Sequence, residues 1–175
     1  GFQMTFGTNH LGPFAFTAGL VDHIVDGGRI VNVASRAHHG PTTIDWDLLK
    51  RPTTTGKSYG EYRVSKLANI LFTKELAKRL APRRIDTFAL HPGVVASDIW
   101  RKIPWPFRSL VTLFMISNDE GARTSLHCAT APGLAGQTGL YWDKCQAVKP
   151  SRAARDEALA AELWRRSEAW IAAGA

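Results

Sequence analysis

Two short apolar runs on either side of a long helical pattern most constrain the fold of this chain. Residues 29–35 (RIVNVAS) and 85–91 (IDTFALH) show little polar alternation, a pattern typical of strands buried on both faces of a parallel sheet. Between them, residues 58–80 carry apolar side chains at helical spacing, and Pro82 ends that pattern. Strand, helix and strand in this order predict an α/β fold with a parallel sheet.

The rest of the chain adds further elements of the same kind and shows no internal repeat or linker. Its length of 175 residues fits one domain with a real core. The expected elements are a helix over about residues 5–25, a long loop over 37–57 with a short helical turn near 46–49, a capped helix from Ser117 towards Pro132, a strand at 139–142 and a last helix over about 153–173.

Tyr62 and Lys66 lie four residues apart within the helical pattern of residues 58–80. In a helix this spacing brings two side chains to one face, about 5–6 Å apart between Cβ atoms. A neighbouring ammonium favours the phenolate and lowers the pKa of a phenol, so such a pair suits proton transfer with a carbonyl or alcohol oxygen. The spacing alone fits a solvated helix face equally well.

Polar or turn-forming residues end both predicted strands. Ser35 closes the first strand, and His91-Pro92-Gly93 turns the chain after the second. Ligands of open α/β sheets bind at this carboxyl edge, although a serine at a strand end more commonly satisfies a turn. Residues 94–116 then include Trp100 and Trp105 in a proline-broken segment, which predicts either a cover over an apolar substrate or a packed surface loop.

Charge and cysteine content narrow the function classes. The formal net charge is +7, yet the basic residues form no block with aromatic interleaving, which argues against nucleic-acid binding. Cys128 and Cys145 have no zinc-ligand spacing, and a reduced, cytoplasmic setting fits them. No apolar run approaches the ~20 residues of a membrane span, which leaves peripheral membrane contact open. We expect His38, His39 and His127 to be loop or surface residues rather than metal ligands.

The order of these motifs resembles the short-chain dehydrogenase/reductase family. Residues 8–12 (TNHLG) are similar to the family's Asn-bearing helix motif, 30–35 to its serine strand and 91–97 (HPGVVAS) to the turn after its sixth strand. The segments most similar to the retinol-dehydrogenase-like branch are residues 9–14 (NHLGPF), 65–72 (SKLANILF), 120–122 (EGA) and 139–141 (GLY). The resemblance covers essentially all 175 residues.

This resemblance implies that Asn9, Ser35, Tyr62 and Lys66 occupy the four catalytic positions. Tyr62 would exchange a proton with the substrate oxygen, and Ser35 would hydrogen-bond that oxygen. Lys66 would lower the pKa of the tyrosine and bind the nicotinamide ribose, while Asn9 would hold a water that links Lys66 to solvent. Hydride addition to a carbonyl builds charge on oxygen, which such donors stabilise in a dry site.

The resemblance also implies the cofactor contacts. NADP or NAD would be bound by Tyr62 and Lys66 and, after the second strand, by Pro92, Gly93, Val95 and Ser97, where Ser97 replaces a more frequent threonine. The family's glycine-rich Gly-x-x-x-Gly-x-Gly turn and its Asn-Ala-Gly motif do not occur. The expected fold is therefore the second half of a doubly wound, parallel-sheet Rossmann-like fold without the N-terminal dinucleotide-binding strands. This partial domain over residues 1–175 would leave the hydrophobic faces of the two long helices and of the inner strands uncovered.

Three functions compete at this point. The first is an NAD(P)-dependent oxidoreductase that interconverts an alcohol and a carbonyl on an apolar small-molecule substrate. The second is a catalytically silent fragment that acts as an interaction or dimerisation module, since paired long helices commonly form homo-oligomer interfaces in the family. The third, nucleic-acid binding, rests on net charge alone. The segment over about residues 94–116 would be the substrate loop of the first.

Overall fold

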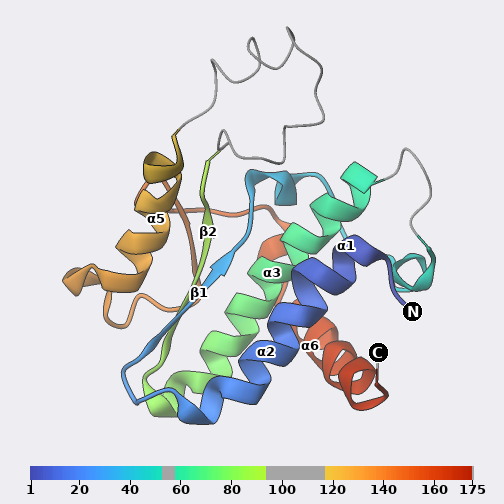
Figure 1. The fold of residues 1–175 in the computed structure, drawn as a ribbon, viewed down its shortest axis with the longest axis horizontal. Coiled ribbons are helices and arrows are strands. Elements are labelled where there is room, and N and C mark those ends of the chain that lie inside the picture. The colour runs from blue at the N-terminus through green and yellow to red at the C-terminus, as the bar shows by residue number, and fades with distance from the viewer. Residues whose placement is uncertain (53–57, 94–116, 175) are drawn as a thin grey trace, which may run out of the picture.

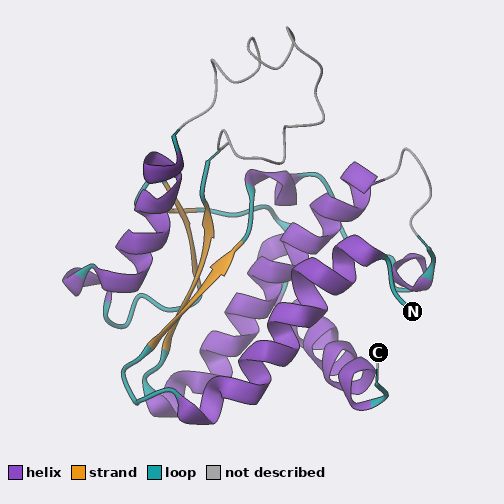
Figure 2. Ribbon diagram, viewed as in Figure 1, coloured by secondary structure: helices purple, strands orange, loops and turns teal. Residues whose placement is uncertain are grey.

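The computed structural model describes residues 1–52, 58–93 and 117–174 as three layers (Figure 1). A sheet of four strands lies between helix α5 (Asn118–Thr130) on one face and helix α3 (Ser58–Leu80) on the other. The purple helices of Figure 2 thus flank the orange strands on both sides. Helix α6 (Glu157–Ala172) packs against α3. Short 3-10 turns lie at Val21–His23, Arg36–His39, Leu48–Lys50, Ala81–Arg83, Pro132–Leu134 and Ala153–Arg155.

The sheet has the strand order β1-β2-β3-β4. Strands β1 (Arg29–Val33), β2 (Asp86–His91) and β3 (Leu140–Asp143) are parallel, and β4 (Gln146–Val148) is antiparallel to β3. The predicted α/β class with a mostly parallel sheet is therefore confirmed. The sequence did not indicate β4, which follows a tight turn in which Lys144 and Cys145 both have positive φ.

Strand β1 differs from its prediction in length and in burial. It ends at Val33, two residues before Ser35, and its side chains are half-buried or, at Val33, 47% exposed. The expectation that it is buried on both faces is wrong, because β1 is the edge strand of the described sheet. Strand β2, between two neighbours, is buried at every position.

The predicted N-terminal helix is three helical segments in succession. Helix α1 (Met4–Phe6) continues into a π-helical turn, Gly7–Leu11, and then into α2 (Gly12–Leu20). Each of these segments follows the previous one without a break in the helical backbone. Single π turns inside helices are rare and occur frequently at functional sites, and this one carries Asn9.

Helix α3 matches its predicted range and contacts the sheet through a polar stripe. Ser65, Asn69 and Thr73 recur every four residues and are all buried. The Thr73 hydroxyl donates to the Asn69 carbonyl oxygen at 2.8 Å and accepts from the Asn32 side chain of β1 at 2.9 Å. Thr87 of β2 donates its hydroxyl to the Thr73 carbonyl at 2.9 Å. Hydrogen bonds as well as apolar contacts therefore fix α3 on the sheet.

Both predicted C-terminal helices are present with side-chain N-caps. Ser117 accepts the backbone N–H of Glu120 at 3.1 Å, which confirms the capped start of α5. Asp156 accepts from the N–H of Leu159 at 3.0 Å, so α6 begins four residues later than the predicted start at residue 153. A 3-10 turn, Ala153–Arg155, occupies the difference.

Apolar side chains remain exposed on the N-terminal helical segment, in the connection that follows it and on β1. Phe16 is 70% exposed and Val25 76%, in addition to Val33 at the sheet edge. The uncovered faces expected of a partial Rossmann-like fold are therefore present on α2 and on the edge strand β1, whereas the inner strand β2 is buried at every position. Within the described residues, no helix combines the length and apolar character that crossing a membrane requires.

Candidate functional site

Tyr62 and Lys66 lie on one face of the N-terminal half of α3. The Lys66 Nζ atom is 5.5 Å from the centroid of the Tyr62 ring, and both residues are half-buried. Burial lowers the pKa of the Lys66 ammonium, because desolvation disfavours its charge. The four-residue spacing thus produces the phenol–ammonium pair that a proton-transfer site needs.

A backbone carbonyl connects this pair to the end of β1. The Val33 carbonyl oxygen accepts a hydrogen bond from Lys66 Nζ at 3.1 Å and another from Asn69 Nδ2 at 3.1 Å. Asn69 is 6% exposed and was not among the predicted site residues, although its place one turn after Ser65 on a helix is visible in the sequence. Because Val33 precedes Ser35 by two residues, α3 holds the chain immediately before the predicted catalytic serine.

Ser35 has extended backbone and begins a tight turn. Its Oγ atom accepts from the N–H of Ala37 at 3.2 Å, as an N-cap does, and the 3-10 turn Arg36–His39 that follows packs against α3. The turn therefore lies beside the helix that carries Tyr62 and Lys66. Ser35 is 8% exposed, so its hydroxyl is at the margin of the packed interior.

Asn9 reaches the same helix from the π turn. Its amide Nδ2 donates to the Ser65 hydroxyl at 3.1 Å, and that hydroxyl donates to the Tyr62 carbonyl at 2.8 Å. Asn9 is thus linked to the helical turn that bears Tyr62. The predicted role of Asn9, which is to hold a water near Lys66, stays a prediction.

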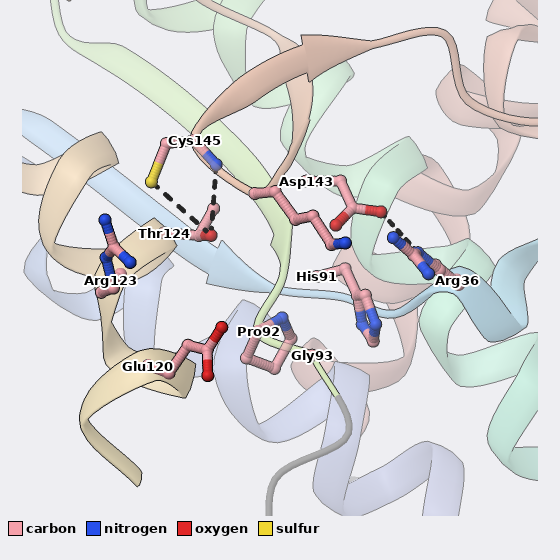
Figure 3. A pocket seen from close by; sticks show the side chains of 10 residues that line it. Arg36, His91, Pro92, Gly93, Glu120, Arg123, Thr124, Asp143 and Cys145 are labelled. Carbon is pink, nitrogen blue, oxygen red and sulfur yellow. Dashed lines mark hydrogen bonds and ion pairs between the residues drawn. The ribbon is translucent and has the colours of Figure 1, made fainter. Parts of the chain in front are cut away.

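Pro92 and Gly93 line a cavity of about 380 Å³ at the carboxyl edge of the sheet (Figure 3). The φ of Gly93 is +96°, a left-handed conformation that a side chain would strain, so the turn requires glycine here. Arg36 and Asp143 form an ion pair of 2.5 Å across one wall. The other lining residues are His91, Glu120, Arg123, Thr124, Lys144 and Cys145.

Several predicted residues lie outside the described part of the chain. These are Val95 and Ser97, the substrate loop over about residues 94–116, and the two tryptophans Trp100 and Trp105 within it. Tyr141, whose hydroxyl is buried without a hydrogen-bond partner among the described residues, was not among the predicted site residues. Burial raises its pKa, and Asp143 adds to that shift.

His38 lies, as expected, in the loop region after β1, but it is not a surface residue. Its side chain is fully buried, and desolvation lowers its pKa to about 4, whereas His39 is exposed and His127 half-buried. A pair of adjacent histidines gives no sign of which ring packs inward. Among the described residues, no group of three or more His, Cys, Asp or Glu side chains is placed to hold a metal ion.

Known proteins share sequence similarity with this chain over most of its length. No family model matches the chain. It is 40% identical over 171 residues to human retinol dehydrogenase 12, covering 94% of this chain and 52% of that protein. The chain therefore spans about half the length of the curated relatives it matches.

Solved structures show the same fold. An uncharacterised protein from Mycobacterium Paratuberculosis matches with a TM-score of 0.72 and 33% identity, over 97% of this chain and 59% of that one. A landomycin C-6 ketoreductase with bound NADP and rabelomycin matches with a TM-score of 0.55 and 20% identity, over 78% of this chain and 47% of the other. The resemblance predicted from the motifs is confirmed by these comparisons.

Proposed function

We propose, from the homology of this chain to retinol dehydrogenases of the short-chain dehydrogenase/reductase family, that it is the catalytic part of an NAD(P)-dependent oxidoreductase. The reaction would interconvert an alcohol and a carbonyl on a small, apolar substrate. One observation carries the proposal. Lys66 Nζ lies 5.5 Å from the centroid of the Tyr62 ring and also donates to the Val33 carbonyl, so the Tyr62–Lys66 pair lies beside the end of the strand that leads to Ser35.

Each residue has a chemical role in this proposal. Oxidation of an alcohol removes a hydride from carbon and a proton from oxygen. Tyr62 accepts that proton, and the Ser35 hydroxyl hydrogen-bonds the same oxygen while its charge changes. The Lys66 ammonium lies near enough to the phenol to favour its ionised form and would bind the cofactor ribose. Asn9 braces the turn that carries Tyr62 and would hold the water expected near Lys66.

The nicotinamide cofactor, NADP or NAD, would take up the hydride. Structural neighbours of the chain bind one or the other. Pro92 and Gly93 line the cavity beside the carboxyl edge where the family's cofactor lies, and Gly93 leaves room for a close approach to its backbone. Val95 and Ser97 stay proposed contacts. The cytoplasmic location likewise stays a prediction.

Substituting Tyr62 with phenylalanine tests the proposal in the full-length protein. Tyr62→Phe removes the proton-transferring hydroxyl but keeps the ring, so we expect turnover with NAD(P) and a retinoid or similar apolar alcohol to fall by orders of magnitude, about 100-fold or more. Tyr59→Phe is the matched control, because the Tyr59 ring stacks on the Tyr62 ring with 6.3 Å between centroids, and Tyr59 is 64% exposed. Equal turnover of Tyr62→Phe and wild type, with both folded by circular dichroism, would reject the assignment.

The exposed apolar side chains support a second candidate, a catalytically silent interaction module that dimerises through its long helices. Phe16 on α2 is the most exposed aromatic side chain among the described residues, at 70%. If such a module exists, Phe16→Ser should shift the protein from dimer to monomer in analytical ultracentrifugation and leave turnover absent in both forms. Wild-type turnover would exclude the silent module and leave dimerisation as a separate property.

A further inference from the structure

The imidazole of His38 uses both ring nitrogens inside the protein. Its Nδ1 atom is 2.6 Å from the Ser35 carbonyl oxygen, and its Nε2 atom is 3.1 Å from the backbone nitrogen of Ser151. A backbone N–H can only donate, so Nε2 accepts the bond from Ser151 and the ring proton is on Nδ1. The ring is therefore neutral, in a single tautomer, and donates to Ser35.

This donation completes a set of hydrogen bonds that fixes Ser35. The Ser35 carbonyl also accepts from the backbone N–H of His38 at 3.2 Å, while Ser35 Oγ accepts from the N–H of Ala37 at 3.2 Å. The carbonyl and the side-chain oxygen of Ser35 are thus both held as acceptors. The hydroxyl proton of Ser35 is left to donate to another group, which is what hydrogen-bonding to a substrate oxygen requires.

The other side of the ring contacts a segment far along the chain. Ser151 precedes the 3-10 turn Ala153–Arg155, and its Oγ atom accepts from the N–H of Ala154 at 3.2 Å. Ala154 is fully buried in the main core cluster, so the segment is anchored there. The ring also meets the Tyr141 ring of β3 edge-on, with 4.7 Å between centroids. His38 therefore has a rigid backing on the side away from Ser35.

We propose that His38 is a positioning residue that orients Ser35 for the reaction, an inference that rests on the proposed function of Ser35. The Nδ1–H of the ring holds the Ser35 carbonyl, and the segment around Ser151 holds the ring. Without that donor, the Ser35 carbonyl keeps only the 3.2 Å hydrogen bond from the backbone N–H of His38, so the turn after β1 is held less firmly and the Ser35 hydroxyl is less well oriented towards the substrate oxygen. Hydride transfer would slow, while cofactor binding, which involves other residues, would not change.

Two amide substitutions separate this role from a purely structural one. The Asn side chain of His38→Asn places an N–H near the position of Nδ1 and so keeps the donor to Ser35. The Gln side chain of His38→Gln instead reaches the position of Nε2 and keeps an acceptor for Ser151. We expect kcat of His38→Asn to stay within about 3-fold of wild type and kcat of His38→Gln to fall about 10- to 100-fold, because small misplacement of a reacting group is costly. The KM for NAD(P) should be unchanged in both.

The same variants in a Ser35→Ala background complete the test. If His38 acts through the Ser35 hydroxyl, His38→Gln should cause no further loss of kcat once that hydroxyl is absent. The inference is overturned if His38→Gln keeps wild-type kcat, if both amide variants lose kcat equally, or if His38→Gln is equally harmful without the hydroxyl. In the parallel assay, full turnover of Tyr62→Phe would instead reject the proposed function, so the two failures are distinguishable. His39→Gln is the control, since His39 is exposed.

Discussion

Replacing His10 with glutamine should remove part of a stability loss that we expect this protein to show between about pH 6.5 and pH 4. The His10 ring is fully buried, with ring centroids 5.0 Å from Phe6 and 6.0 Å from Phe72. Its Nε2 atom is 3.0 Å from the Ser167 hydroxyl of α6. Desolvation lowers the pKa of His10 from 6.5 to about 4, and the neighbouring Asn69 amide opposes this only in part.

The sign and size of the effect follow from proton linkage. Between these two pKa values the unfolded chain binds a proton at His10 that the folded protein does not bind. The free energy of unfolding therefore rises with pH across this window. The contribution of neutral His10 to stability is fully present above about pH 6.5 and is lost as pH falls towards 4. One pKa unit corresponds to about 1.4 kcal/mol, so the shift from 6.5 to about 4 corresponds to about 3 kcal/mol. The lowered pKa of His38 acts in the same direction and adds to the total.

Urea unfolding of the full-length protein at a series of pH values between 7 and about 4 measures this contribution of His10 to the free energy of unfolding. His10→Gln retains a hydrogen-bonding group for Ser167 but cannot titrate. Its unfolding free energy should therefore depend less on pH, by up to about 1.4 kcal/mol per pH unit. His23→Gln is the control, because the side chain of His23 is exposed and its removal should leave the wild-type slope. Identical slopes for wild type and His10→Gln would refute the reasoning.

Two further substitutions test the packing that supports the site. Thr73→Val removes the hydroxyl that accepts a hydrogen bond from the Asn32 amide, and we expect it to lower the free energy of unfolding by about 1–3 kcal/mol. An unchanged free energy of unfolding would indicate that the Asn32 amide finds another acceptor. The Phe72 ring centroid lies 5.2 Å from that of Phe14 and 5.7 Å from that of Trp164. Phe72→Ala should therefore lower the free energy of unfolding by about 3–5 kcal/mol. Phe16→Ala, at an exposed position, should lower it by about 0.5 kcal/mol or less. Equal costs in chemical denaturation would contradict the assignment of Phe72 to the core.

The local sequence pattern was sufficient to predict the elements that lie between other described elements of the fold. Residues 58–80 gave the bounds of α3, and the apolar run at 85–91 gave β2, which has a strand on each side and is buried throughout. The Ser117 cap was also readable, because its donor lies three residues away in sequence. The four-residue spacing of Tyr62 and Lys66 predicted their shared face for the same reason.

The features that the sequence did not predict depend mainly on contacts between segments that are distant in sequence. The partial exposure of β1 follows from its place at the sheet edge, which no feature of residues 29–33 encodes. The burial of His38 requires Ser151, 113 residues away, as a partner. Strand β4 is three residues long and exposed, so it carries no hydrophobic signal. The π turn at Asn9 likewise leaves no periodicity that separates it from an ordinary helix.

The polar stripe of α3 explains how a helix and a strand end can form a site with fixed geometry. An apolar face would allow α3 to slide on the sheet with little change in buried area, because the hydrophobic effect has no direction. Hydrogen bonds from Asn69 to the Val33 carbonyl and from Asn32 to Thr73 permit one register, since a shift would leave buried polar groups unpaired. Lys66 binds the same Val33 carbonyl, so the register of the helix also sets the position of its ammonium relative to the strand that leads to Ser35.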